Sequence, residues 1–229
     1  MKNHLPNAVT CLNLFAGCLA LSSIFAGRLE TAAYFVGLAA LFDFFDGLLA
    51  RALHASSPIG KDLDSLADMV SFGVVPGAFL FDLLMQAGPS LPSWLPYAGF
   101  LVTIFSALRL AKFNNDTRQT TSFIGLPTPA CTILVASLPL ILAHDTFGIR
   151  GLILNPWVLL GLAVLLSGLL VAELPLFALK FKSLRWQDNQ VRFVFLLLSA
   201  GLLLLLQAAA VPLVILLYVL LSVMRPAQV

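Results

Sequence analysis

The sequence predicts an all-α, polytopic membrane protein with about eight transmembrane helices. Hydrophobic residues make up 60% of the 229-residue chain, and charged residues make up only 10%. The mean hydropathy is +0.98. The apolar residues also fall in long runs, and a helix needs about 20 consecutive apolar residues to cross a bilayer. These three observations place the chain among polytopic membrane proteins.

The apolar runs, taken in chain order, define the expected helices. The longest polar segments between these runs are residues 112–122 and 180–190, which we expect to be cytoplasmic loops. The expected helices cover residues 7–27, 31–53, 64–87, 93–113, 128–145, 156–175, 191–207 and 209–224. We expect them to form a single integral membrane domain over residues 1–229.

The last two helices depend on how one long apolar stretch is divided. Residues 191–223 are almost continuously apolar, and at about 1.5 Å per residue they exceed one bilayer core. Gln207 and Pro212 predict a tight turn inside the stretch, which gives two short helices. If the stretch forms one span instead, the protein has seven transmembrane helices.

The basic residues predict the orientation in the membrane. With both termini in the cytoplasm, only Arg28 and Arg150 of the thirteen basic residues lie outside. The eleven cytoplasmic ones are Lys2, Arg51, Lys61, Arg109, Lys112, Arg118, Lys180, Lys182, Arg185, Arg192 and Arg225. This asymmetry follows the positive-inside rule and predicts a protein of the cell membrane. The net charge of only +2 argues against a nucleic-acid partner.

Four carboxylates lie close together in this hydrophobic chain, between residues 43 and 68. They are more than a third of the eleven acidic residues. An unpaired carboxylate at the centre of a bilayer costs about 2.5–3.5 kcal/mol even on the mildest scale. Hard divalent cations such as Mg²⁺ or Mn²⁺ prefer oxygen ligands and often bridge carboxylates to phosphates, so they would neutralise the group.

The first half of this segment places its functional residues on one helical face. That face holds positions i, i+3, i+4 and i+7, which are Asp43, Asp46, Gly47 and Ala50. Gly47 and Ala50 leave room for a phosphorylated ligand to approach the backbone. Arg51 follows at the membrane edge as a candidate phosphate partner.

The second half predicts another helix that faces the same gap. Asp64 and Asp68 stand at i and i+4, so the two helices together offer four carboxylates, enough for two divalent ions. Ser56-Ser57-Pro58 predicts an N-cap followed by proline at the first helical position. The positive end of this helix would then point toward the phosphates. The expected metal ions and the helix N-terminus together indicate phosphate chemistry at the cytoplasmic interface.

Residues 43–68 match the pattern D-x2-D-G-x2-A-R-x8-G-x3-D-x3-D at every specified position. This pattern is the signature of the CDP-alcohol phosphotransferase family, which the chain resembles. The stretches 6–17, 63–76, 107–114 and 123–129 resemble the bacterial and archaeal phosphatidylserine synthases within that family. The likeness is good over residues 1–130 and continues beyond them only in hydropathy.

The resemblance implies a transferase that binds CDP-diacylglycerol at two divalent ions, Mg²⁺ or Mn²⁺, and releases CMP. By resemblance, Asp68 is also the general base, and the metal ligands are Asp43, Asp46, Asp64 and Asp68. The residues implied to surround the CDP-lipid are Asn7, Thr10, Gly47, Ala50, Arg51, Ser57 and Gly60. The active site would face the cytoplasm, and the protein would be a homodimer among membrane lipids.

The acceptor implied by the resemblance is L-serine, which gives phosphatidylserine. Inositol phosphate, glycerol phosphate and choline are used by relatives and stay open as alternatives. Serine carries a carboxylate that needs a cation, and Arg109 is the candidate, with Lys112 and Arg118 behind it. An equally open interpretation makes Arg109 a topology anchor that extends to the membrane surface.

A different class of protein also fits an acidic membrane segment, namely a cation-coupled transporter. A transporter predicts acidic residues at several depths along a pathway. The four carboxylates of residues 43–68 are expected at one depth, which favours the enzyme.

Overall fold

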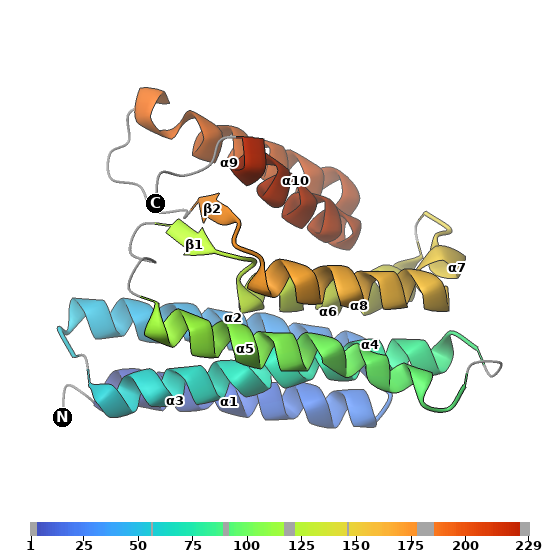
Figure 1. Ribbon diagram of the computed structural model, residues 1–229, viewed down its shortest axis with the longest axis horizontal. Coiled ribbons are helices and arrows are strands. Elements are labelled where there is room, and N and C mark those ends of the chain that lie inside the picture. Colours follow the sequence, from blue (N-terminus) through green and yellow to red (C-terminus); the bar gives the residue numbers. More distant parts are fainter. Residues whose placement is uncertain are drawn as a thin grey trace.

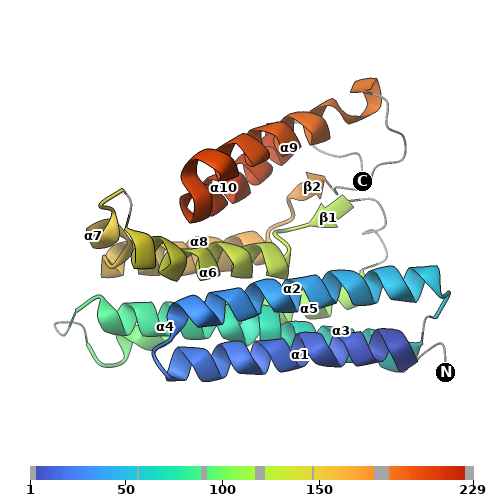
Figure 2. The ribbon, with the colours of Figure 1, turned by 180° about the vertical axis from the view of Figure 1, so that it is seen from behind.

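The computed structural model describes residues 4–55, 57–88, 92–116, 122–145, 147–177 and 186–224. Figure 1 shows three stacked layers of helices, and Figure 2 shows the same order from behind. The first layer contains α1 (His4–Phe25), α2 (Leu29–Ala52), α3 (Pro58–Asp68), α4 (Val75–Gln86) and α5 (Leu101–Asn115). The second contains α6 (Thr128–His144) and α8 (Pro156–Val171), and the third contains α9 (Trp186–Leu206) and α10 (Ala210–Met224).

Short elements connect these helices. They are the π-helix η1 (Met69–Val74), the 3₁₀ helices η2 (Leu95–Phe100) and η3 (Gln207–Ala209), the one-turn helix α7 (Arg150–Ile153), and the strands β1 (Ser122–Ile124) and β2 (Pro175–Phe177). Because η1 joins α3 directly to α4, these three elements form one long helical segment. In the same way η2 runs directly into α5.

The described residues contain five helical stretches that are long and apolar enough to cross a membrane. These stretches are His4–Phe25, Leu29–Ala52, Pro58–Gln86, Leu95–Asn115 and Asn189–Met224. The helices α6 and α8 are apolar but shorter, with 17 and 16 residues. The predicted all-α, polytopic membrane class is therefore confirmed.

The last of these stretches is divided as the sequence predicts. It has 36 residues, and η3 interrupts it at Gln207, whose φ is +49°. The two helices on either side, α9 and α10, lie next to each other as a hairpin (Figure 1). Pro212 falls in the first turn of α10, where a missing N–H breaks no helical hydrogen bond. Within the described residues, each of the eight expected spans corresponds to a helix.

The π-helix η1 replaces part of the continuous α-helix expected over residues 64–87. Pro76 lacks the N–H that would normally bond to the carbonyl of Phe72. The Thr132 hydroxyl of α6 lies 3.0 Å from that carbonyl and 2.9 Å from the carbonyl of Thr128, so these two acceptors share its one hydrogen. On the α5 side, the Thr103 hydroxyl donates to the carbonyl of Gly73 over 2.8 Å. Neighbouring helices thus supply donors to two carbonyls of η1, which suits irregular backbone inside a membrane.

A two-stranded ribbon, which the sequence did not predict, links the second and third layers. Strand β1 pairs antiparallel with β2, with Phe123 opposite Leu176. Directly after β1, Gly125 adopts φ +76°, and its N–H donates to the carbonyl of Leu174 over 3.0 Å. A side chain at Gly125 would press against backbone carbonyls at the end of α8, so only glycine fits.

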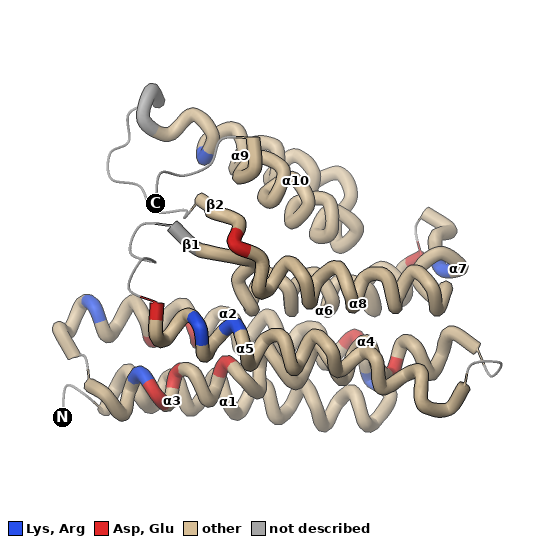
Figure 3. The backbone as a smooth tube through the Cα atoms, in the orientation of Figure 1, with Lys and Arg blue, Asp and Glu red and all other residues tan. Residues whose placement is uncertain are grey.

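The hydrophobic core lies around α4, between the first two layers. The side chains of Phe79, Leu80, Leu83 and Leu84 are fully buried. They belong to one cluster with side chains of α6 and α8. Figure 3 shows that most Lys, Arg, Asp and Glu residues lie near the two ends of the helices. This distribution suits helices whose middle segments cross a bilayer.

Candidate active site

Three of the four predicted carboxylates meet between α2 and α3. Asp43 comes from α2, and Asp64 and Asp68 lie one turn apart on α3. One carboxylate oxygen from each lies within 4.8 Å of the others. All three side chains are partly buried, so water shields their mutual repulsion incompletely. We call these three residues the acidic trio.

Asp46 lies beside the acidic trio and is buried more deeply, with 6% of its surface exposed. Its Oδ2 atom is buried without a hydrogen-bond partner, and so is Oδ1 of Asn13 on α1. The other end of the Asn13 amide donates to Oδ1 of Asp68 over 3.2 Å. Several carboxylate oxygens and an unpaired amide oxygen thus meet in one place. This all-oxygen donor set fits a hard divalent cation.

A pocket of about 250 Å³ opens directly next to these carboxylates, between α1, α2 and α3. Asp46 and Asp64 form part of its wall. Six of the seven residues predicted to surround a CDP-lipid also line it, and these are Asn7, Thr10, Gly47, Ala50, Ser57 and Gly60. The pocket is therefore large enough for part of a ligand and touches the candidate metal ligands directly.

The first turn of α3 forms one wall of the pocket because of its local sequence. Ser57 is the N-cap, with its hydroxyl accepting a 3.0 Å hydrogen bond from the N–H of Gly60, and Pro58 follows at the first helical position. Ser56 lies outside the described residues. A Cβ atom at Gly60 would lie 3.0 Å from both the Asn7 amide oxygen and the Ser57 hydroxyl. Glycine thus keeps this wall open.

Arg51, the seventh predicted residue, is exposed and does not line the pocket. Its Nε atom donates to the carbonyl of Gly47 over 2.9 Å, one helical turn back. This bond holds the side chain along α2, next to a residue that does line the pocket. The guanidinium therefore lies near the pocket edge rather than inside it.

The three predicted acceptor-binding residues have different positions. Arg109 is only 6% exposed, its Nε lacks a hydrogen-bond partner, and its guanidinium carbon lies 5.8 Å from the centre of the Phe113 ring. It also interacts electrostatically with Asp68. Burial does not fit a topology anchor that extends to the membrane surface. Lys112 is exposed, and Arg118 lies outside the described residues.

Two further polar residues join the site although neither was predicted as a site residue for the CDP-lipid or the metals. Asn13 contacts Asp68, as described above. Lys61 lines the pocket, and its Nζ donates to the carbonyl of Asn114 over 3.0 Å. The spacing of Asn7, Thr10 and Asn13 at every third position of an apolar helix could have indicated Asn13. Lys61 lies inside the residue 43–68 pattern, but at one of its unspecified positions.

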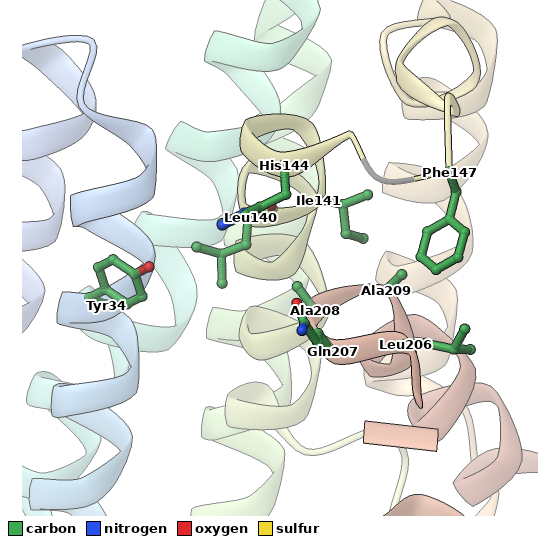
Figure 4. A pocket seen from close by; sticks show the side chains of 9 residues that line it. All are labelled: Tyr34, Leu140, Ile141, His144, Phe147, Leu206, Gln207, Ala208 and Ala209. Atoms are coloured by element: carbon green, nitrogen blue, oxygen red, sulfur yellow. The ribbon is translucent and has the colours of Figure 1, made fainter. Parts of the chain in front are cut away.

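A second pocket, of about 140 Å³, lies at the other end of α2 (Figure 4). It is formed by α2, α6 and the turn between α9 and α10, and its polar side chains include Tyr34 and His144. The Tyr34 hydroxyl donates to Glu30 over 2.9 Å, and Nδ1 of His144 pairs with the Leu140 carbonyl over 3.1 Å. Since these polar groups have partners and no carboxylate lines the pocket, it is not a candidate active site.

A helical membrane protein with an acidic cluster beside a ligand pocket has the architecture of a membrane-embedded transferase. The CDP-alcohol phosphatidyltransferase family matches residues 3–174, so the chain belongs to this family. The family prediction from the residue 43–68 pattern is thereby confirmed. Membership identifies the protein as an enzyme and argues against the transporter alternative.

Several relatives share one name, CDP-diacylglycerol–serine O-phosphatidyltransferase. The protein of that name from Bacillus subtilis is 33% identical over 162 residues, which cover 67% of this chain and 88% of the relative. The one from Helicobacter pylori strain J99 is 29% identical over 198 residues, or 85% of this chain and 79% of the relative. A Mycobacterium leprae protein of the same name is 31% identical over 141 residues, or 58% of this chain and 46% of the relative.

Proposed function

We propose that the protein transfers the phosphatidyl group of CDP-diacylglycerol to L-serine, which yields phosphatidylserine and CMP. The observation that carries this proposal is the acidic trio, with oxygens within 4.8 Å, placed next to a pocket of about 250 Å³. The shared name of the relatives supports both substrates. We further propose that the whole chain, residues 1–229, forms one functional domain.

The four predicted aspartates would hold two divalent ions, either Mg²⁺ or Mn²⁺. When bound, these ions supply positive charge that stabilises the attacking and leaving oxygens of an in-line displacement at phosphorus. The pocket residues of α1, α2 and the first turn of α3 would bind the cytidine diphosphate part. The α3 N-terminus favours negative phosphate oxygens because its first N–H groups point that way. The acyl chains stay in the bilayer.

Asp68 would act as the general base. The serine hydroxyl oxygen bonds to the phosphorus that carries diacylglycerol, the bond from that phosphorus to the CMP oxygen breaks, and the hydroxyl proton passes to Asp68. The hydrogen bond from Asn13 holds the Asp68 carboxylate in a fixed orientation. A neutral alcohol is a weak nucleophile, so a base within hydrogen-bond reach accelerates its attack.

Arg109 would bind the serine carboxylate. A guanidinium matches a carboxylate with two parallel hydrogen bonds, and the unpartnered Nε leaves this cation free for such a contact. Lys112 and Arg118 remain the further candidates for this contact. Arg109→Lys keeps the charge but loses the planar fork, so it should raise the KM for serine strongly and leave that for CDP-diacylglycerol nearly unchanged. An unchanged serine KM would assign the carboxylate to another cation.

The proposal is tested by incubating purified protein with CDP-diacylglycerol and, in turn, L-serine, inositol phosphate, glycerol phosphate and choline. We expect CMP release with serine, and phosphatidylserine as the lipid product in mass spectrometry. Chelation should abolish turnover, and Mg²⁺ or Mn²⁺ should restore it. Release with a different alcohol would overturn the acceptor assignment, and full activity after exhaustive chelation would overturn the two-ion assignment.

We also propose that the protein resides in the cell membrane with both termini and the active site on the cytoplasmic side. The distribution of Lys and Arg supports this orientation. A single cysteine introduced as Asp62→Cys, in a background without other cysteines, should react with a membrane-impermeant maleimide only in opened cells. The proposed homodimer, which the family resemblance implies, is tested by the mass of the protein in detergent micelles.

A further inference from the structure

A further pocket, of about 410 Å³, lies at the end of the molecule opposite the candidate active site. Its walls come from the turn between α1 and α2, the last residue of α4, one side of α6 and the start of α7. Figures 1 and 2 both show the α1–α2 turn and α7 at the same end of the molecule, away from the first turn of α3. This pocket shares no lining residue with the one beside the acidic trio.

Two arginines from distant parts of the sequence line this pocket, Arg28 and Arg150. Arg28 connects α1 to α2 in the first layer, and Arg150 begins α7, which connects the two helices of the second layer. They are also the two basic residues expected on the non-cytoplasmic side of the membrane. A single arginine there could simply mark the membrane edge. Two arginines in one pocket concentrate positive charge at one point and attract an anion.

Hydrogen bonds fix the backbone at both arginines. Gly27 has φ +70°, and the N–H of Arg28 donates to the carbonyl of Ser23 over 2.8 Å, which closes the C-terminus of α1. At the other arginine, the N–H of Arg150 donates to Oδ1 of Asp145 over 3.1 Å. The two side chains therefore start from ordered turns on different layers.

The guanidinium groups are available to a ligand. Neither has a hydrogen-bond or ion-pair partner within the residues that the structure describes. The acidic side chain in the pocket wall is Glu30, which accepts the Tyr34 hydroxyl over 2.9 Å. Two positive charges thus face one negative charge. The first turn of α2 also lines the pocket and has no side-chain cap, so its N–H groups add to the attraction for an anion.

The rest of the wall indicates which anion fits. Beside the arginines it is apolar, with Leu29 of α2 and Pro139 and Leu142 of α6. Three apolar helices of the first layer, α1, α2 and α4, begin or end at this pocket. The ends of membrane-spanning helices lie at the depth of the lipid headgroups. A phosphate with apolar chains attached therefore matches both the charge and the position of the pocket.

We propose that this pocket binds the phosphate group of a membrane phospholipid between Arg28 and Arg150. Arginine pairs with phosphate oxygens through two parallel hydrogen bonds, and the lipid chains would lie along the apolar wall. The phosphate would link the α1–α2 turn of the first layer to α7 of the second, and it would offset the repulsion between the two arginines. This binding site goes beyond the proposed transfer reaction and does not depend on it.

The test measures dissociation constants by native mass spectrometry of the purified protein in a neutral detergent with EDTA. Without metal, the carboxylates of the candidate active site repel anionic probes. Dioctanoyl phosphatidylglycerol carries phosphate and chains, whereas dioctanoylglycerol carries the chains alone. We expect the wild type to bind the first at least about tenfold more tightly, as charge-assisted hydrogen bonds imply. Inorganic phosphate at the same concentration should not displace the bound lipid.

Three variants locate the phosphate. Each basic residue near charged lipid strengthens binding about fivefold, so Arg28→Gln with Arg150→Gln should weaken phosphatidylglycerol binding about 25-fold. Lys112→Gln with Arg192→Gln is the matched control, because it removes the same charge outside this pocket and should change the affinity less than about twofold. Glu30→Gln removes the negative charge of the wall and should strengthen binding about fivefold.

The dissociation constant is measured on folded protein, so it remains informative if a variant is less stable. Unchanged affinity in the variant without both arginines would overturn the inference, and so would an equal loss in the control. Unchanged or weaker binding in Glu30→Gln would contradict a phosphate beside this carboxylate. Displacement of the lipid by inorganic phosphate at equal concentration would overturn the lipid assignment and indicate a site for a free anion.

Discussion

Asp64→Asn should stabilise the metal-free protein and at the same time abolish its stabilisation by metal. Asp64 lies close to two other carboxylates, those of Asp43 and Asp68, with one oxygen no more than 4.8 Å from an oxygen of each. Two charges at that separation repel by about 3 kcal/mol at the effective dielectric constant of about 20 that suits protein sites. Asparagine keeps the size of the side chain and removes the charge. The variant therefore relieves repulsion that bound cations relieve in the wild type.

The expected shift in melting temperature follows from these values. For a protein of this size, 1 kcal/mol corresponds to about 2–4 °C, so metal-free Asp64→Asn should melt about 6 °C or more above the metal-free wild type. The wild type should gain about 2.7 kcal/mol when the metal concentration reaches about 100 times its dissociation constant. The variant should gain much less, because it has lost a ligand. The difference between the melting temperatures of Asp64→Asn and the wild type should therefore shrink, or change sign, as metal is added.

The measurement is circular dichroism of the purified protein in detergent during heating, with EDTA or with increasing Mg²⁺ or Mn²⁺. Asp82→Asn is the matched control, since Asp82 lies on α4 outside the acidic trio and accepts a hydrogen bond from Gln86. It should leave the response to metal unchanged. The reasoning is refuted if metal-free Asp64→Asn melts at or below the wild type and still responds to metal as the wild type does.

Three further substitutions test separate parts of the structure. Asp68→Asn should lower kcat by about 10² or more with little change in the KM for CDP-diacylglycerol, and near-normal turnover would exclude a general base there. Gly60→Ala should raise the KM for CDP-diacylglycerol several-fold and leave the KM for serine unchanged, since the new Cβ would lie 3.0 Å from the Asn7 oxygen. A normal KM for CDP-diacylglycerol, together with a crystal structure in which the pocket is unchanged, would contradict this. Thr132→Val removes the hydroxyl that donates to the Phe72 carbonyl, so it should lower the free energy of unfolding, measured by chemical denaturation, by about 1–3 kcal/mol. The control Thr31→Val, on the surface of α2, should leave the free energy of unfolding unchanged.

Most of the fold could be predicted because membrane spans are local properties of the sequence. A run of apolar residues must be helical in a bilayer, whatever its neighbours are. The ends were less predictable. Hydropathy placed the start of one span at residue 64, because the polar first turn of α3 adds nothing to it, whereas the capping pattern of Ser57 and Pro58 correctly predicted that the helix begins at Pro58. The ribbon of β1 and β2 was missed because each strand has three residues and is defined by its partner, far away in the sequence.

In the candidate site, too, the features set by local sequence could be predicted and those set by tertiary packing could not. The carboxylate positions followed from helical periodicity, since Asp64 and Asp68 must share a face on any helix. The meeting of α2 with α3 was inferred from the charges, and the structure brings Asp43 within 4.8 Å of both. Lys61 lies in the same segment at an unspecified position of the pattern, and its place at the pocket could not be predicted. Its partner, the carbonyl of Asn114, is set by tertiary packing that periodicity does not describe.

The π-helix η1 explains how one long helix can serve both the site and the core. Each α-helical residue turns the chain by about 100°, so an extra residue in a π turn rotates all that follows by roughly this angle. In this protein α3 presents Asp64 and Asp68 to the pocket side, and α4 buries Phe79 and Leu83 in the core. A continuous α-helix would tie the two faces to one fixed angle. Pro76 favours the irregular turn because it cannot bond to Phe72, and the Thr132 hydroxyl compensates. The extra residue thus rotates the apolar face relative to the acidic face, which lets a charged site form on a helix whose other half lies in the centre of the hydrophobic core.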